Sequence, residues 1–312
     1  MAVPFFGAAD VEAAVPPDVA YAAVRDAFVA YARGDWSMQP KLYVTNYPAG
    51  DFRAMPALGG GHALLKWVTS FPGNPARGLP TVSGVVVLSN AETGEVVALL
   101  EAGAVTALRT GAAAVLAAET LRRADAGPAA VVGAGVNGRA AARTFVALGR
   151  PVALWDLDAA RARAAADEVG ASVAGSAAEA LAADVLVTVT PGKKILLPPG
   201  SLRPGQHVSL LGADGPGKAE IAVEELARAR LFCDDWEQAS HGGDLAAAVE
   251  AGAIGRDDVT ELGDVLVGSK PGRTAEAEIT VFDSTGLAIQ DLAVARAALA
   301  RADELDLPRL AL

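Results

Sequence analysis

The 312-residue chain is long enough for two domains, because a single hydrophobic core rarely grows beyond about 250–300 residues. Its net charge of −11 argues against nucleic acid or an anionic membrane surface as the main partner. Cys233 is the one cysteine, so no disulfide can form within the chain, which suits a reducing compartment. No segment is typical of a signal peptide or of a membrane span of roughly 20 apolar residues. We therefore expect a cytoplasmic protein.

The first part of the chain predicts one helix followed by a β-rich region. Apolar residues at helical spacing indicate a helix from about Asp18 to Arg33, and Gly34 provides its stop. Short apolar pieces separated by Gly, Pro and Asn turns then follow from Lys41 to Leu100, a pattern typical of a meandering, mostly antiparallel sheet. A long helix is expected from about Val105 to Arg123.

Beyond this helix, short apolar strands alternate with helical segments. Such alternation indicates βαβ units and a parallel sheet. We therefore predict an α/β protein with a Rossmann-type doubly wound parallel sheet and a smaller α+β domain. A last strand is expected at 278–286, and a final helix from Ile289 places Leu292, Ala293 and Leu299 on a buried stripe.

A glycine-rich segment follows the first strand of this region and opens a helix. Its residues Gly133, Gly135 and Gly138, with Val136 and Asn137 between them, match the pattern G-x-G-x-x-G. The three glycines permit a tight turn, close approach of a pyrophosphate and close helix–strand packing. The next strand ends in Asp156, which can accept the ribose hydroxyls and would repel a 2′-phosphate. This context predicts NAD, although Arg161 and Arg163 leave some use of NADP open; a parallel domain that binds no nucleotide is the alternative.

Four cationic side chains stand in apolar, strand-like surroundings in the first part of the chain. They are Lys41, Arg53, Lys66 and Arg109. Each alone is more typical of a partly exposed side chain or a structural ion pair than of a catalyst. Together they indicate a cationic pocket, in which arginine holds a substrate carboxylate and a desolvated lysine exchanges protons near neutral pH.

Several longer motifs resemble one family over nearly the whole chain. The segments 53–57, 65–68, 71–75, 78–82, 106–112, 212–220 and 281–286 are similar to those of the ornithine cyclodeaminase/mu-crystallin family. Within that family, Gln39–Val44 and Asp235–Asp244 resemble the archaeal alanine dehydrogenase branch. Cyclodeaminases usually place Arg where this chain has Lys41, which favours simple amino-acid oxidation.

The resemblance implies a role for each matching position. Arg53, Lys66 and Arg109 match positions that hold the substrate carboxylate, and Lys66 could also act as a proton donor. Lys41 matches a further pocket position, and Asp214 matches the acid/base carboxylate. Positions near the cofactor are matched by Thr81, Thr110, Lys218 and Ser284.

The resemblance also implies the division of the chain. We expect 1–117 with 288–312 to form the substrate-binding and dimerisation domain, and 118–287 to form the NAD-binding domain. The expected assembly is a homodimer. No His, Asp or Cys cluster has metal-ligand spacing, so no metal is expected.

Our first hypothesis for function is an NAD-dependent L-amino-acid dehydrogenase with alanine as substrate. It would transfer a hydride from Cα to NAD and hydrolyse the imine to a 2-oxo acid and ammonia. Ornithine (or lysine) cyclodeaminase, which gives proline and ammonia, and ketimine reductase are alternatives that the same fold permits. A binding protein without turnover is a third possibility, but it gives no reason to retain Arg53, Lys66, Arg109 and Asp214 together.

Overall fold

The computed structural model describes residues 2–192, 194–213, 215 and 217–312, and the chain divides into two compact units. Unit 1 comprises Met1–Arg109 and Leu287–Leu312, and unit 2 comprises Thr110–Gly286. The expected domain boundary is at 117/118, whereas the two units divide at 109/110. Both positions lie inside helix α3 (Ala102–Leu121). A helix that continues through a boundary gives no turn or composition signal, so the sequence could not locate the division.

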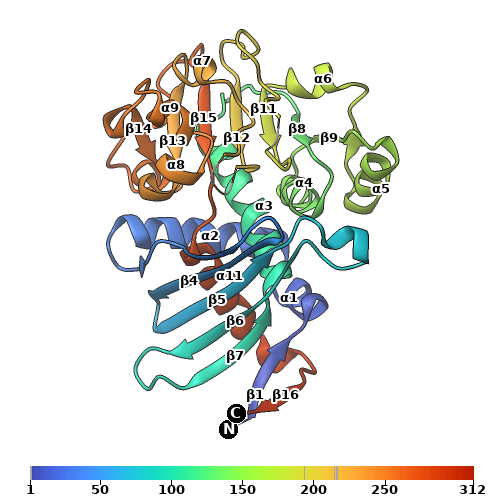
Figure 1. The fold of residues 1–312 in the computed structure, drawn as a ribbon, viewed down its shortest axis with the longest axis vertical. Helices are drawn as coiled ribbons and strands as arrows, with labels where there is room; N and C mark the ends of the chain where they lie inside the picture. The colour runs from blue at the N-terminus through green and yellow to red at the C-terminus, as the bar shows by residue number, and fades with distance from the viewer. Residues whose placement is uncertain (1, 193, 214, 216) are drawn as a thin grey trace. The chain divides into compact units, whose positions relative to one another are not determined.

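Unit 1 is built on a mixed sheet with helices α2 and α11 packed together, α11 lying on β4 and β5 (Figure 1). All neighbouring strands in this sheet are antiparallel except β1 and β7, which are parallel. The strand that contains Ala2 pairs with the strand that contains Ala311, so these two segments from opposite ends of the chain lie side by side. The order is β16 (Arg309–Ala311), β1 (Ala2–Phe6), β7 (Val96–Glu101), β6 (Val82–Asn90), β5 (His62–Ser70), β4 (Gly50–Gly59) and β2 (Ser37–Met38), with β3 (Leu42–Asn46) also paired to β4.

Helix α11 (Ala288–Leu299) of unit 1 buries more of its surface than an amphipathic pattern predicts. Helix α11 buries Ile289, Leu292 and Ala293 as expected, whereas Leu299 at its end is partly exposed. It also buries Gln290 and Asp291, which lie outside the predicted stripe. A helix enclosed on nearly every side therefore carries two polar side chains into the interior. The helical segments are α1 (Ala8–Ala14), α2 (Pro17–Ala32), η1 (Asn74–Arg77), α11 (Ala288–Leu299) and η3 (Ala302–Glu304).

Helix α3 is longer and more apolar than the sequence analysis allowed for. By length and composition alone its 20 residues could cross a membrane, so the expectation that no segment has this character was too strict. The most apolar window is 72% buried within the structure, the pattern of a core helix. Its many alanines account for both the high hydropathy and the close packing.

Unit 2 is a parallel sheet whose strand order reverses beside β8. Strand β8 pairs with β9 on one side and β11 on the other, all in parallel register. In sheets of this kind ligands bind at the carboxyl ends of the strands where the order reverses. The strands are β10 (Ser172–Val173), β9 (Val152–Trp155), β8 (Ala129–Val132), β11 (Val185–Thr188), β12 (His207–Leu210), β15 (Thr280–Asp283), β13 (Arg230–Cys233) and β14 (Val259–Glu261). The helices are α4 (Val136–Ala147), α5 (Ala159–Val169), α6 (Ala177–Leu181), α7 (Val223–Leu226), α8 (Trp236–Gly242), α9 (Ala246–Glu250), η2 (Arg256–Asp258) and α10 (Leu262–Leu266).

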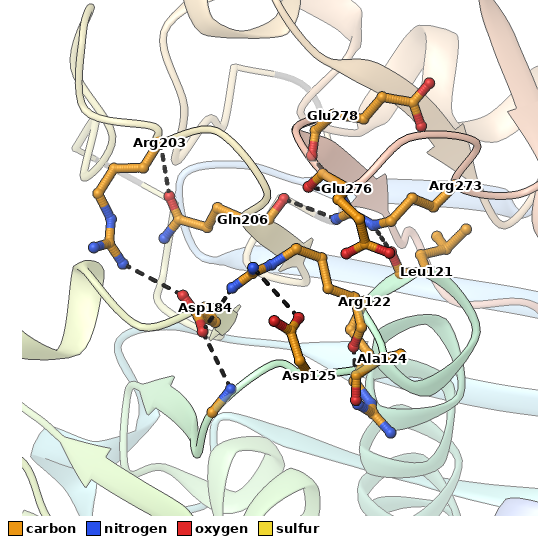
Figure 2. Close-up of polar contacts among 12 residues, drawn as sticks. Leu121, Arg122, Ala124, Asp125, Asp184, Arg203, Gln206, Arg273, Glu276 and Glu278 are labelled. Carbon is orange, nitrogen blue, oxygen red and sulfur yellow. Dashed lines mark hydrogen bonds and ion pairs between the residues drawn. The ribbon is translucent and has the colours of Figure 1, made fainter.

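The amino-terminal edge of the parallel sheet is held by an arginine network (Figure 2). The Nε of Arg273 donates to the carbonyl of Leu121 at 2.7 Å, and its Nη2 donates to the carbonyl of Gln206 at 3.2 Å. Asp184 accepts from Arg123 at 3.0 Å at the start of β11. The network joins the end of α3 to the strands at the edge opposite the glycine-rich segment.

Candidate active site

Lys66 is buried in unit 1 with two acceptors for its amine. It points inward from β5, and only 1% of its side chain is exposed. Nζ donates to Oδ1 of Asp291 at 2.7 Å and to Oγ1 of Thr106 at 3.1 Å. Burial lowers the pKa of Lys66 from 10.5 to about 8; the charge of Asp291 raises it, while Arg109 and Arg53 lower it further. Lys66 can therefore exchange a proton near neutral pH.

Arg109 and the two polar residues of α11 extend this cluster. The Nε of Arg109 lies 3.4 Å from Oδ1 of Asp291, and its Nη1 donates to Oε1 of Gln290 at 3.4 Å. Among the described residues, Nε of Arg109, Oδ2 of Asp291 and Nε2 of Gln290 are buried without a hydrogen-bond partner. Such groups are costly unless a ligand or water satisfies them, so the cluster has hydrogen-bonding capacity left for a bound molecule.

Arg53 lies on the same face of the sheet as Lys66. It pairs across β4 and β5 with Val68, two residues beyond Lys66, and successive side chains of a strand alternate between faces. Its Nε donates to Oδ1 of Asp51 at 2.6 Å, and its guanidinium lies 5.3 Å from the ring centre of Tyr43. A carboxylate and an aromatic ring thus orient Arg53, whose planar fork can bind a second carboxylate.

The other two predicted residues of unit 1 lie in connecting segments. Lys41 directly precedes β3, whose Tyr43 pairs with Arg53. Thr81 is exposed directly before β6, and its carbonyl accepts from the amide of Phe71 at 2.8 Å. The roles expected for both residues stay predictions.

The glycine-rich segment of unit 2 has the shape that a dinucleotide requires. Gly133 has a φ of 108°, and a Cβ there would lie 2.3 Å from the carbonyl oxygen of Val189. A Cβ on Gly138 would lie 1.7 Å from the carbonyl oxygen of Gly133, whereas one on Gly135 would meet nothing within 4 Å. The open space is therefore over Gly135, at the start of α4, where free backbone N–H groups favour a phosphate.

Asp156 is fixed beside this segment by backbone amides. Its Oδ2 accepts from the amide of Ala134 at 2.8 Å, and its Oδ1 accepts from the amide of Asp158 at 2.9 Å. Each carboxylate oxygen keeps further acceptor capacity. Arg161 approaches the same carboxylate at 3.9 Å. The residues present thus fit the adenosine ribose of NAD.

The remaining predicted cofactor positions of unit 2 also follow the carboxyl ends of parallel strands, apart from Thr110 on α3. Lys218 is partly exposed in the segment after β12, and Ser284 is buried directly after β15. Val136 is 67% exposed and Asn137 is partly buried, both in the first turn of α4. The Oγ1 of Thr110 is buried and has no hydrogen-bond partner in the described part of the chain. Asp214, the expected acid/base residue, lies outside the described residues.

A buried carboxylate holds the segment that follows β15. Asp234 accepts from Oγ of Ser284 and Oγ1 of Thr285, each at 3.2 Å, and from the amide of Gly286 at 2.7 Å. In the described residues no three His, Cys, Asp or Glu side chains are placed to hold a metal ion. Asp234 therefore orders a turn at the carboxyl edge of the sheet.

The acidic partners of the predicted cations were not predicted from the sequence. Asp51 could have been found, because it stands two residues before Arg53 in a strand and must share its face. Asp291 gave no such signal, since it is 225 residues from Lys66 and the helical pattern placed it off the buried stripe. The structure thus adds the two carboxylates of Asp51 and Asp291 to the predicted cationic pocket.

Comparison with known proteins identifies the family. The sequence profile of the ornithine cyclodeaminase/mu-crystallin family matches residues 5–305. The chain belongs to this family. It is 43% identical over 298 residues to an alanine dehydrogenase of Archaeoglobus fulgidus, covering 92% of this chain and 91% of that protein. It is also 36% identical over 257 residues to an ornithine cyclodeaminase of Agrobacterium tumefaciens, covering 79% and 71% of the two chains.

A solved structure supports both the fold and the cofactor chemistry of the family. An archaeal alanine dehydrogenase dimer with bound NAD superposes on the whole of both chains with a TM-score of 0.94 at 39% identity. The predicted family, Rossmann-type α/β fold and alanine dehydrogenase resemblance are therefore confirmed.

Proposed function

We propose that this chain is an NAD-dependent L-amino-acid dehydrogenase that acts on alanine or a similarly small, neutral amino acid. The observation that carries the proposal is buried Lys66 held beside Asp291 and Arg109, because an amine with a pKa of about 8 exchanges protons near neutral pH. The 43% identity to an alanine dehydrogenase over 92% of the chain supports the choice of substrate.

The side chains of unit 1 bind and orient the substrate in this proposal. Arg109 and Arg53 hold the α-carboxylate, which fixes the position of Cα. Neutral Lys66 takes a proton from the substrate amine during oxidation, and protonated Lys66 returns it in the reverse direction. Asp214 remains the proposed second acid/base group on the family resemblance. Lys41 is proposed to line the same pocket.

The residues proposed to hold NAD are those of the glycine-rich segment and the carboxyl edge of the parallel sheet. The open space over Gly135 admits the pyrophosphate, and Asp156 accepts from the ribose hydroxyls. Thr81, Thr110, Lys218 and Ser284 are proposed as further contacts. When bound, NAD accepts the hydride of the substrate Cα, and hydrolysis of the resulting imine releases a 2-oxo acid and ammonia.

An assay of substrates and products tests this function. The purified protein is incubated with NAD and, separately, L-alanine, L-ornithine, L-lysine or L-arginine, while NADH is followed by its ultraviolet absorbance. We expect NADH and pyruvate with alanine. Proline and ammonia from ornithine without net NADH would instead identify a cyclodeaminase, and no product from any substrate would favour a binding protein.

We further propose that the protein is a cytoplasmic homodimer assembled through the sheet of unit 1. Leu58, Leu65 and Trp67 are 50%, 42% and 38% exposed on the face of β4 and β5 opposite Lys66. A contiguous apolar face of this kind is typical of a subunit interface. The related archaeal alanine dehydrogenase was solved as a dimer.

Light scattering after size-exclusion chromatography tests the dimer. We expect a dimeric mass for the native chain and a monomeric mass for Leu65→Asp, because a charge cannot be buried in an apolar interface without a partner. Leu157→Asp, at a position that is 91% exposed in unit 2, serves as the matched control and should remain dimeric. A monomeric native chain contradicts the proposal.

A further inference from the structure

The contact between Lys66 and Asp291 joins the two separate chain segments that form unit 1. Lys66 comes from β5 and Asp291 from α11, 225 residues later, and the two side chains are 1% and 0% exposed. Their atoms lie 2.7 Å apart. An ion pair so deeply buried costs desolvation energy and is weak evidence for stability. The alternative explanation for this buried ion pair is that Asp291 fixes the position of the Lys66 amine.

Among the residues that the structure describes, two acceptors are placed at the three N–H positions of the Lys66 amine. Oδ1 of Asp291 and Oγ1 of Thr106 each accept from Nζ. Thr106 donates its own hydrogen to the carbonyl of Ala102 at 2.6 Å, so its oxygen faces Lys66 as an acceptor. A lysine ammonium has three N–H donors. When Lys66 loses a proton, these two acceptors retain two N–H groups, and the lone pair occupies the third position.

We propose that Asp291 is a positioning residue for proton transfer at Lys66, which fixes Nζ so that the N–H not bound by Asp291 or Thr106 is the one exchanged with substrate. The inference deepens the proposed dehydrogenase function and rests on it for its catalytic part. Asp291 does not itself touch the reacting atoms in this scheme. It acts through the orientation and charge of Lys66.

The charges around Lys66 predict how the site responds when Asp291 is neutralised. Within the described part of the chain, the charge of Asp291 raises the pKa of Lys66, while Arg109 and Arg53 lower it. Asp51 faces Arg53 rather than Lys66. Replacing Asp291 by asparagine removes this negative charge from beside Nζ, so we expect the pKa of Lys66 to fall below about 8.

The first test measures Lys66 directly and does not depend on turnover. Protein labelled with carbon-13 at lysine Cε is titrated by NMR, and the Lys66 signal is assigned with Lys66→Met. We expect the midpoint of that signal to move to lower pH in Asp291→Asn and to return towards the native value in Asp291→Glu. Glu304→Gln removes an exposed charge that pairs with Arg301 in the same unit, and it should leave the midpoint unchanged. An unchanged midpoint in Asp291→Asn overturns the proposal.

The second test measures catalysis in the same variants. For Asp291→Asn we expect kcat with alanine to fall by about tenfold or more, with a smaller change in KM and an unchanged Kd for NADH. If Asp291→Asn does not fold, Thr106→Val removes the second acceptor and should lower kcat, while Thr106→Ser should restore it. A native kcat in both acceptor variants overturns the positioning role. If the native protein oxidises no amino acid, the proposed function fails, and the NMR titration still decides whether Asp291 controls Lys66.

Discussion

In the proposed reaction, the protonation of Lys66 should govern the rate in each direction, because burial lowers its pKa to about 8. Oxidation of alanine needs the neutral amine as proton acceptor, and the rate should rise with pH through about 8. Reductive amination needs the protonated amine, and its rate should fall through the same pH. Initial rates in both directions measure the two profiles. Lys66→Met should lose most turnover and keep NADH binding; an oxidation rate independent of pH around 8 excludes Lys66 as the base.

At the scale of residues, the cationic side chains of the site were easier to predict from the sequence than the residues that surround them. Arg53, Lys66 and Arg109 were predictable because positive side chains in apolar surroundings need a reason to be there. The strand-like surroundings expected for Arg109 were wrong, since it lies on helix α3. The acidic partners of these cations were not equally predictable from the sequence. Asp51 follows from the strand period, but Asp291 depends on a contact between distant segments that no local pattern reports. The roles of Lys41, Thr81 and Asp214 stay predictions.

Helix α4 offers a matched pair of substitutions that separates cofactor binding from folding. Gly135→Ala meets no atom within 4 Å, so we expect native stability but an affinity for NADH reduced by about tenfold or more, equivalent to about 1.4 kcal/mol. In Gly138→Ala the new Cβ would lie 1.7 Å from the carbonyl oxygen of Gly133, which forces the helix away from β8. We expect a loss of about 1–3 kcal/mol in the free energy of unfolding. Chemical denaturation and NADH fluorescence titration distinguish the two variants, and equal behaviour contradicts these roles.

At the scale of elements, the repeating patterns were predictable and the short edge strands were not. The antiparallel strands β4 to β7 and the βαβ units follow from alternation of apolar residues and turns. Strands β1 and β16 were not predicted because each is short and pairs with a segment at the other end of the chain, as Ala2 pairs with Ala311. Helix α1 covers only seven residues and was likewise missed.

In unit 2 as a whole, buried carboxyl groups should make stability depend on pH. Burial and the charge of Glu220 raise the pKa of Asp244 from 3.8 to about 7. Between these values the folded protein holds a proton that the unfolded chain releases, so the free energy of unfolding falls as the pH rises towards 7. His207, whose pKa burial lowers from 6.5 to about 3, has the opposite effect below pH 6.5. The contribution of Asp244 is therefore best seen as a difference between variants.

Asp244→Asn should flatten this dependence. The variant cannot ionise, so its Tm should fall less than that of the native protein between acid and neutral pH, by roughly 2–4 °C for each kcal/mol removed. Thermal melts at several pH values measure the difference. Asp257→Asn, at an exposed position of the same unit, should follow the native curve. Parallel curves for Asp244→Asn and the native protein would show that Asp244 is ionised in both the folded and unfolded states.

The division of unit 1 between the two ends of the chain has a consequence for the order of synthesis. Residues 110–286 leave the ribosome as one continuous stretch, and domains generally fold as units while the chain is being made. Helix α11 emerges only afterwards, with Asp291 near its start. Unit 2 can therefore complete its sheet while Lys66 still lacks its counterion. Unit 1 is completed only when helix α11 has been made, although most of its residues are translated before those of unit 2.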